Sequence, residues 1–130
     1  MKIERNIDVE EEIRVALSDY IKTYVRPLPA DFEVPSILVT AVGGSTENTV
    51  AYFDVTLDSR ATEDATALDN LRNAVGILVE IAKSQTSKLS FAVVNNLGSW
   101  GKDPVRPELA MCTARLRVIA HNETVEVNTI

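Results

Sequence analysis

The order in which helix-like and strand-like patterns alternate along the chain constrains the fold more than any other feature. Apolar residues recur with helical spacing after Asp8, and segment 36–58 then holds two runs of strand length. A second helical stripe fills segment 62–83, and segment 89–121 holds two more strand-like runs. In 130 residues, this order predicts a single α+β domain: a mostly antiparallel four-stranded sheet with two helices packed on one face.

The first helix is predicted by both its start and its spacing. Asp8 can accept a hydrogen bond from the first turn, and Glu11 lies three residues later, as in a capping box. The apolar stripe recurs at steps of three and four residues as far as Tyr24, and Pro27 forbids continuation. We therefore expect one helix between Asp8 and Pro27.

The second helix carries an apolar stripe that is wider than one core-facing edge. Thr62 is the expected N-cap, followed by Glu63 and Asp64 in the first turn. Ile77 and Ile81 lie beside the main stripe and widen it. Such a stripe indicates a helix covered on more than one side, and packing against both the sheet and a neighbouring subunit would achieve this.

Alternation of apolar and polar residues predicts a long last strand over 109–121. This strand places Arg115 and Arg117 on the face opposite its apolar residues. Asp54 and Asp58 share one face of an earlier alternating strand. The arginines can therefore pair with these carboxylates across the sheet, each exposed pair contributing about 0–1 kcal/mol.

A third strand is expected over 89–94, followed by a loop over 95–108 that contains Trp100. The tryptophan is flanked by glycines, and an aromatic side chain on such a loop is often an interface anchor. The alternative is that Trp100 folds back over the end of the sheet. The two interpretations stay open on the sequence alone.

The polar tail over 122–130 is expected to be a C-terminal arm beyond a domain of residues 1–121. Val125 and Val127 alternate with polar residues in it. Such a tail is either a mobile arm or a strand that forms only against a partner.

Composition limits the function classes. The net charge is −6, which argues against general affinity for nucleic acid or anionic membranes. A single cysteine, Cys112, excludes an internal disulfide. The start lacks the apolar stretch of a secretory signal, and no run approaches the ~18 apolar residues of a membrane span. We expect a soluble intracellular protein with no membrane partner.

The candidate catalytic and ligand-binding residues do not form a site. The run Gly43-Gly44-Ser45-Thr46 can aim amides at a phosphate, but it lacks the lysine of a phosphate-binding loop and fits a hairpin loop better. Cys112 and His121 lie nine apart on one predicted strand, so they point to opposite faces. No cluster of His, Cys or carboxylates suggests a metal site. We therefore expect no catalytic residues, no metal and no cofactor.

Three pieces of the chain carry a family resemblance. They are Asp8-Val9-Glu10-Glu11-Glu12-Ile13 with the later Val42-Gly43-Gly44; Tyr52-Phe53-Asp54-Val55-Thr56-Leu57 with Ser59-Arg60-Ala61-Thr62-Glu63-Asp64-Ala65; and Trp100-Gly101-Lys102-Asp103-Pro104 with Arg106-Pro107 and Arg117-Val118-Ile119-Ala120. With these segments, the chain resembles the tail terminator (tail completion) proteins of long-tailed bacteriophages. The resemblance covers most of the chain, from Val9 to His121.

The resemblance implies a structural virion protein. Members of that family form a homohexameric ring on the last ring of the tail tube, stop its growth and offer a surface to the head-side connector. The implied partners are further copies of the chain, the major tail tube protein and the connector or stopper protein, with DNA passing through without specific binding. The implied location is the head–tail junction of the virion, after assembly in the host cytoplasm.

Two other functions remain open. One is another phage neck protein, such as a head-completion connector. The other is a small α+β ligand-binding or enzymatic module with Gly43, Gly44 and His121 near a subunit interface. Under the terminator interpretation, the candidate interface residues are Ile77, Ile81, Trp100, Arg115, Arg117, Val125 and Val127.

Overall fold

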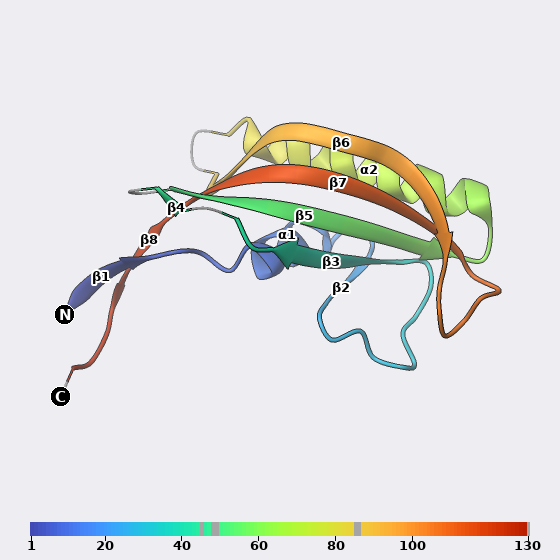
Figure 1. Ribbon diagram of the computed structural model, residues 1–130, viewed down its shortest axis with the longest axis horizontal. Helices are drawn as coiled ribbons and strands as arrows, with labels where there is room; N and C mark the ends of the chain where they lie inside the picture. The colour runs from blue at the N-terminus through green and yellow to red at the C-terminus, as the bar shows by residue number, and fades with distance from the viewer. Residues whose placement is uncertain (45, 48–49, 85–86, 130) are drawn as a thin grey trace.

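The computed structural model describes residues 1–44, 46–47, 50–84 and 87–129, which form two helices and eight strands in one α+β domain (Figure 1). In chain order the elements are β1 (Lys2–Arg5), α1 (Val9–Leu17), β2 (Lys22–Val25), β3 (Ser36–Val42), β4 (Thr46–Glu47), β5 (Val50–Ala61), α2 (Asp64–Ala82), β6 (Leu89–Lys102), β7 (Ala110–His121) and β8 (Glu123–Glu126).

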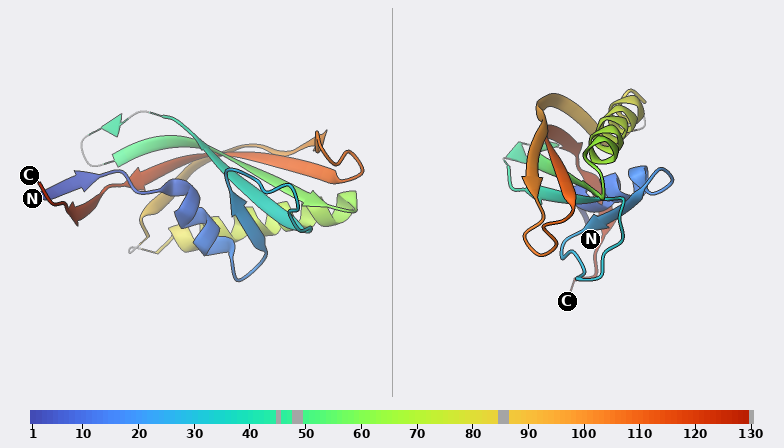
Figure 2. Two further views of the ribbon diagram at one scale, coloured as in Figure 1. Left: turned by 90° about the horizontal axis from the view of Figure 1, so that it is seen from below. Right: turned by 90° about the vertical axis from the view of Figure 1, so that its right-hand side faces the viewer.

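The main sheet is larger than predicted. Its strand order is β2-β3-β5-β7-β6, with β4 beside β5, and it curls along its length (Figure 2). β2 runs parallel to β3, and the other pairings are antiparallel. The four predicted strands correspond to β3, β5, β6 and β7, so the prediction of a four-stranded sheet is wrong in number. It missed β4, which is two residues long, and β2, which lies inside an apolar pattern of helical spacing.

The first helix begins as predicted but ends earlier. Asp8 is the N-cap of α1, and its Oδ1 accepts a hydrogen bond from the Glu11 amide at 3.2 Å. The predicted extension to Tyr24 is wrong, because the helix ends at Leu17 and Lys22–Val25 pairs with β3. Pairing within the sheet therefore outweighs the helical spacing of the apolar residues that follow Leu17.

The second helix, α2, lies along the sheet and begins later than predicted (Figure 1). Thr62 is not its N-cap. Glu63 occupies that position without a side-chain hydrogen bond to the first turn. Because β5 continues to Ala61, which pairs with Ala110, the chain turns at Thr62 and Glu63 before the helix can start. Within the described part of the chain, no helix is both long and apolar enough to cross a membrane.

One hydrophobic core lies between the two helices and one face of the sheet. Helix residues such as Ile13 and Leu71 are fully buried with strand residues such as Leu57. In β7 every second residue from Cys112 to Ala120 is buried, which confirms the predicted inner face. Burying one side chain of leucine size contributes about 1.5–3 kcal/mol, so this layer holds both helices on the sheet.

Strand β6 extends eight residues beyond the predicted strand end at 94. Its pairing with β7 shifts between Phe91 and Val93 and again between Asn95 and Ser99, and Gly98 has a positive φ of 98°. Such irregularities break the period of two that marks a strand in the sequence. The prediction of a loop over 95–108 is therefore wrong as far as Lys102.

The tail predicted as either a mobile arm or a strand that forms only against a partner pairs with the start of the same chain. β1 and β8 form a separate antiparallel two-stranded sheet, with Ile3 opposite Val125. This ribbon extends beyond the end of the main sheet, as Figures 1 and 2 show. The β8 strand therefore needs no partner chain in order to form. We call the β1–β8 ribbon the arm.

Candidate interaction surfaces

A groove lies between α1 and α2, near the C-terminal end of α2. Ile81 lines this groove and is 44% exposed, whereas Ile77 is half-buried against the core. At the rim, Lys88 Nζ lies 3.7 Å from Glu12 Oε1. We call this surface the helix groove; its apolar lining comprises Ala16, Leu78, Ile81 and Leu89.

The wide apolar stripe of α2 is covered on one flank by α1. Tyr20, just beyond α1, donates from its hydroxyl to Asn70 Oδ1 and accepts from Asn73 Nδ2, both at 3.0 Å. On the other flank Val79 is 38% exposed beside the start of β6. The sheet and α1 therefore cover α2 on two sides within the chain, as the width of its apolar stripe predicts. The contact of Ile77 and Ile81 with another subunit stays a prediction.

Trp100 lies near the opposite end of α2. It stands opposite Cys112 in the β6–β7 register and is 52% exposed. The next residues, Gly101 and Lys102, line a hollow together with Asp64, the first residue of α2. A helix of 19 residues is about 28 Å long, so Trp100 and the helix groove are well-separated apolar surfaces.

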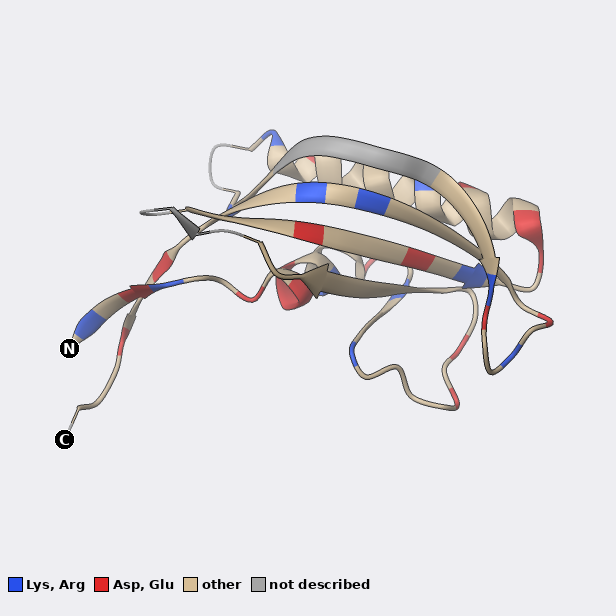
Figure 3. Ribbon diagram, viewed as in Figure 1, with Lys and Arg blue, Asp and Glu red and all other residues tan. Residues whose placement is uncertain are grey.

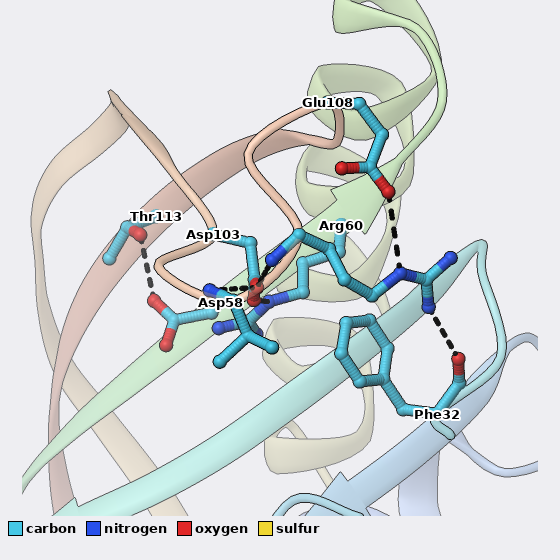
Figure 4. Close-up of polar contacts among 8 residues, drawn as sticks. Phe32, Asp58, Arg60, Asp103, Glu108 and Thr113 are labelled. Atoms are coloured by element: carbon cyan, nitrogen blue, oxygen red, sulfur yellow. Dashed lines mark hydrogen bonds and ion pairs between the residues drawn. The ribbon is translucent and has the colours of Figure 1, made fainter. Parts of the chain in front are cut away.

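A buried ion pair fixes the chain just beyond Trp100. Arg60 at the end of β5 donates from Nε to Asp103 Oδ2 at 2.7 Å, and the two side chains are 7% and 3% exposed (Figure 4). The second carboxylate oxygen of Asp103 accepts from the amides of Val105 and Arg106, at 2.9 and 2.7 Å. Asp103 therefore ties the turn that follows β6 to the end of β5.

Phe32 joins the loop between β2 and β3 to the same cluster. Its ring lies 4.8 Å from the guanidinium of Arg106 and 5.7 Å from that of Arg60, and its carbonyl accepts from Arg106 Nη1 at 3.0 Å (Figure 4). Arg60 Nη1 is buried without a hydrogen-bond partner among the described atoms. We call Phe32, Arg60, Asp103 and Arg106 the Arg60 cluster. It holds two loops against one end of the sheet.

The electrostatics of the Arg60 cluster favour the ionised form of Asp103. Burial alone raises the pKa of this carboxyl. Hydrogen bonds from the Arg106 amide, the Arg60 guanidinium and the Val105 amide more than offset the effect of burial, so the pKa of Asp103 lies below its ordinary value. No pattern in the sequence predicts this cluster, since its members lie far apart in the chain. The only local signal was Asp103-Pro104, a dipeptide typical of turns.

The sheet face opposite the helices carries bands of charge on β5 and β7 (Figure 3). Arg117 Nε lies 3.4 Å from Asp54 Oδ1, which confirms one predicted cross-strand pair. The prediction that Asp58 pairs with an arginine is wrong, because the register places Thr113 opposite it, and the Thr113 hydroxyl donates to Asp58 at 2.7 Å. Arg115 is exposed and has no ion-pair partner among the described residues. Arg115 and Arg117 line a hollow on this face.

The residues weighed as catalytic do not come together. Cys112 is fully buried, and burial raises the pKa of its thiol. His121 is exposed on the other face of β7, so the prediction of opposite faces is confirmed. A Cβ atom on Gly44 would lie 1.4 Å from the Tyr52 carbonyl oxygen, so close backbone packing requires this glycine. Ser45 lies outside the described residues. No group of three or more potential metal ligands occurs among the residues described.

Comparison with known proteins does not assign the chain to a family. No protein-family model matches it, and no curated protein sequence matches it. Function is therefore inferred from the helix groove, Trp100, the Arg60 cluster and the arm, together with the residue patterns that resemble phage tail terminators.

Proposed function

We propose that this chain is a structural subunit of a phage virion, a tail terminator whose copies form a sixfold ring on the end of the tail tube. The ring stops growth of the tube and offers a docking surface to the head-side connector. The sequence resemblance suggests this role, and the surfaces of the structure support it as follows.

Two different apolar surfaces at opposite ends of α2 carry the proposal. The helix groove exposes Ile81, and the far end exposes Trp100. A closed ring of more than two copies needs two distinct complementary surfaces on each subunit. Exposed aromatic and aliphatic side chains are the usual anchors of such contacts. In this proposal each subunit contributes one surface to each neighbour.

The Arg60 cluster supports the assignment of the Trp100 end to docking. Its buried ion pair and the ring of Phe32 hold both loops at this end in one arrangement. A surface that is already ordered loses less conformational entropy when a partner binds. We assign this end to contacts with the tube or the connector as well as with the neighbouring subunit.

The overall charge is compatible with a ring around DNA. A net charge of −6 for each chain repels a duplex that passes through the centre. The exposed Arg115, beside the Arg117–Asp54 pair, is then available for acidic groups of protein partners. DNA is expected to pass without specific binding.

Sedimentation velocity tests the ring. We expect a particle six times the 14.3 kDa mass of the chain, with a central hole in negative-stain images. Ile81→Asp and Trp100→Ser should each reduce it to smaller species while circular dichroism stays unchanged. Arg72→Gln is the matched control for Ile81→Asp. It changes the charge by one unit on the same helix, on an exposed position nine residues away and hence on the opposite side, and should leave the ring intact.

Immunogold labelling of virions tests the place of the ring. Antibody against this chain should label the junction of head and tail. Label on the capsid surface or at the distal tail tip, or a chain absent from purified virions, would contradict the terminator assignment. A wild-type chain that stays monomeric at every concentration would contradict the ring itself.

A further inference from the structure

The arm is largely separate from the rest of the fold. Ile3 lies opposite Val125 in its two-stranded sheet, and the Val127 amide donates to the Met1 carbonyl at 2.9 Å. Figures 1 and 2 show the arm extending away from the main sheet. The side chains of Ile3, Val125 and Val127 remain only half-buried. A ribbon of two short strands is marginally stable in water unless something further pairs with it or covers it.

Each strand of the arm has one unpaired edge. Among the described residues, β1 pairs with β8 alone and β8 with β1 alone. An unpaired edge presents free amide and carbonyl groups, which readily pair with a strand of another chain. The arm therefore offers two different edges for pairing, one from β1 and one from β8.

The two edges are complementary in charge (Figure 3). β1 carries Lys2, Glu4 and Arg5, for a net charge of +1, and β8 carries two glutamates, Glu123 and Glu126, with no basic residue. Within one arm the opposite charges already meet, because Lys2 stands opposite Glu126 and Arg5 opposite Glu123. The Nε of Arg5 lies 3.0 Å from Oε1 of Glu123.

This charge pattern selects which edges can meet between copies. Antiparallel pairing of two β8 edges would place Glu123 against Glu126, and pairing of two β1 edges would place Lys2 against Arg5. Like charges directly opposite one another destabilise a strand pair. Pairing of β1 with β8 of another copy instead repeats the opposite-charge pattern found inside the arm.

We propose that the arms of neighbouring copies pair edge to edge, β1 of one copy against β8 of the next, and that the arms of a closed ring together form one antiparallel β-barrel. The occupant of each edge is a second copy of this chain. Because the two edges differ, the contact is head-to-tail and closes under cyclic symmetry. All arms then point the same way, so β1 and β8 alternate around the ring and every junction is antiparallel. Closure leaves no free edge.

The number of strands in this barrel rests on the proposed sixfold ring, but the edge pairing does not. A charge-swapped chain tests the edge pairing separately from the sixfold ring. It carries Lys2→Glu, Arg5→Glu, Glu123→Lys and Glu126→Lys, which preserve opposite charges inside each arm and between identical copies. At a junction between a swapped and a wild-type chain, both edges carry the same sign of charge.

Subunit exchange read by native mass spectrometry tests the edge pairing. Wild-type chain is mixed with ¹⁵N-labelled swapped chain, and mixed assemblies should be at least tenfold rarer than random exchange predicts. Labelled chain with Glu80→Lys and Lys83→Glu is the matched control, since it reverses an exposed ion pair at the C-terminal end of α2 and should mix at random. Random mixing of the arm-swapped chain would overturn the edge pairing and leave the ring standing. Sorting into assemblies of another size would support the pairing and overturn the sixfold ring.

Disulfide cross-linking gives a second measurement that does not depend on the swapped chain folding. Glu4 and Thr124 are partners across the arm, so a chain with Glu4→Cys and a separate chain with Thr124→Cys can cross-link only between copies. The native Cys112 is fully buried and does not compete. Oxidation of the mixture should favour the heterodimeric cross-link at least tenfold over either homodimer. Predominance of a homodimer, or a wild-type chain that is monomeric at every concentration, would overturn the proposal.

Discussion

The two ends of the molecule hold their chain segments by different physical means. At the end that carries Trp100, the Arg60–Asp103 pair is buried, and its carboxylate accepts two further hydrogen bonds from backbone amides. At the other end, the Arg5–Glu123 pair of the arm is similar in length, at 3.0 Å, but its side chains are 57% and 28% exposed. At the Trp100 end the polar groups of Asp103 are paired within the chain. In the arm, each strand keeps one unpaired edge among the described residues, which a strand of another chain can pair with.

The difference in burial decides how much each ion pair contributes to the free energy of unfolding. An exposed pair gains little, because water screens the charges and two long side chains must be ordered. Burial of an ion pair removes both ions from water at a large cost in desolvation free energy, which their mutual attraction offsets. Removal of one partner therefore leaves the other buried and uncompensated. The same kind of contact is therefore a structural requirement in the Arg60 cluster and a minor contribution in the arm.

The largest expected effect comes from breaking the buried pair. Asp103→Ala should lower the free energy of unfolding by about 3–5 kcal/mol, because it leaves the Arg60 guanidinium buried without its counter-ion. Glu123→Ala removes a carboxylate from the arm and should change the free energy of unfolding by no more than about 1 kcal/mol. Urea denaturation of both variants measures the contrast. Equal losses would contradict the distinction between the two ends.

A smaller effect on the free energy of unfolding is expected when the pH is lowered. The pKa of Asp103 is lowered in the folded state, so its contribution is fully present above the ordinary aspartate pKa of about 3.9. It is lost as the pH falls from there through the lowered value. The stability difference between wild type and Asp103→Ala should therefore be constant near neutral pH and shrink below about pH 4. A difference that stays constant down to the acid transition would show that the charge of Asp103 contributes nothing.

The sequence revealed the parts of the fold that have a local signal. The Asp8 cap depends on residues only three positions apart. The inner face of β7 depends on an alternation of buried and less buried residues that runs without interruption from Cys112 to Ala120. Both predictions are confirmed for this reason. The end of α1 and the N-cap of α2 were misjudged, because pairing in the sheet moved both boundaries.

The surfaces that distinguish this chain depend on residues distant in sequence. Arg60 and Asp103 meet across 43 positions, and β1 pairs with β8 across nearly the whole chain. No periodicity links such segments. For Trp100 the sequence left open an interface anchor or a side chain folded back over the end of the sheet, and the register shifts of β6 concealed that it lies on a strand. Candidate residues could therefore be chosen from the sequence, whereas their grouping into surfaces required the structure.

Hydrogen exchange of the arm, measured by mass spectrometry below and above the concentration at which copies associate, tests the central claim most directly. In the monomer the amides of β1 and β8 should exchange far faster than those of the central β5–β7 pair, because a lone two-stranded ribbon opens readily. On association the arm should become strongly protected, while the segment around Asp103 should change little because it is already ordered. An arm that exchanges equally fast in both states would contradict the account that a second copy completes this end of the molecule.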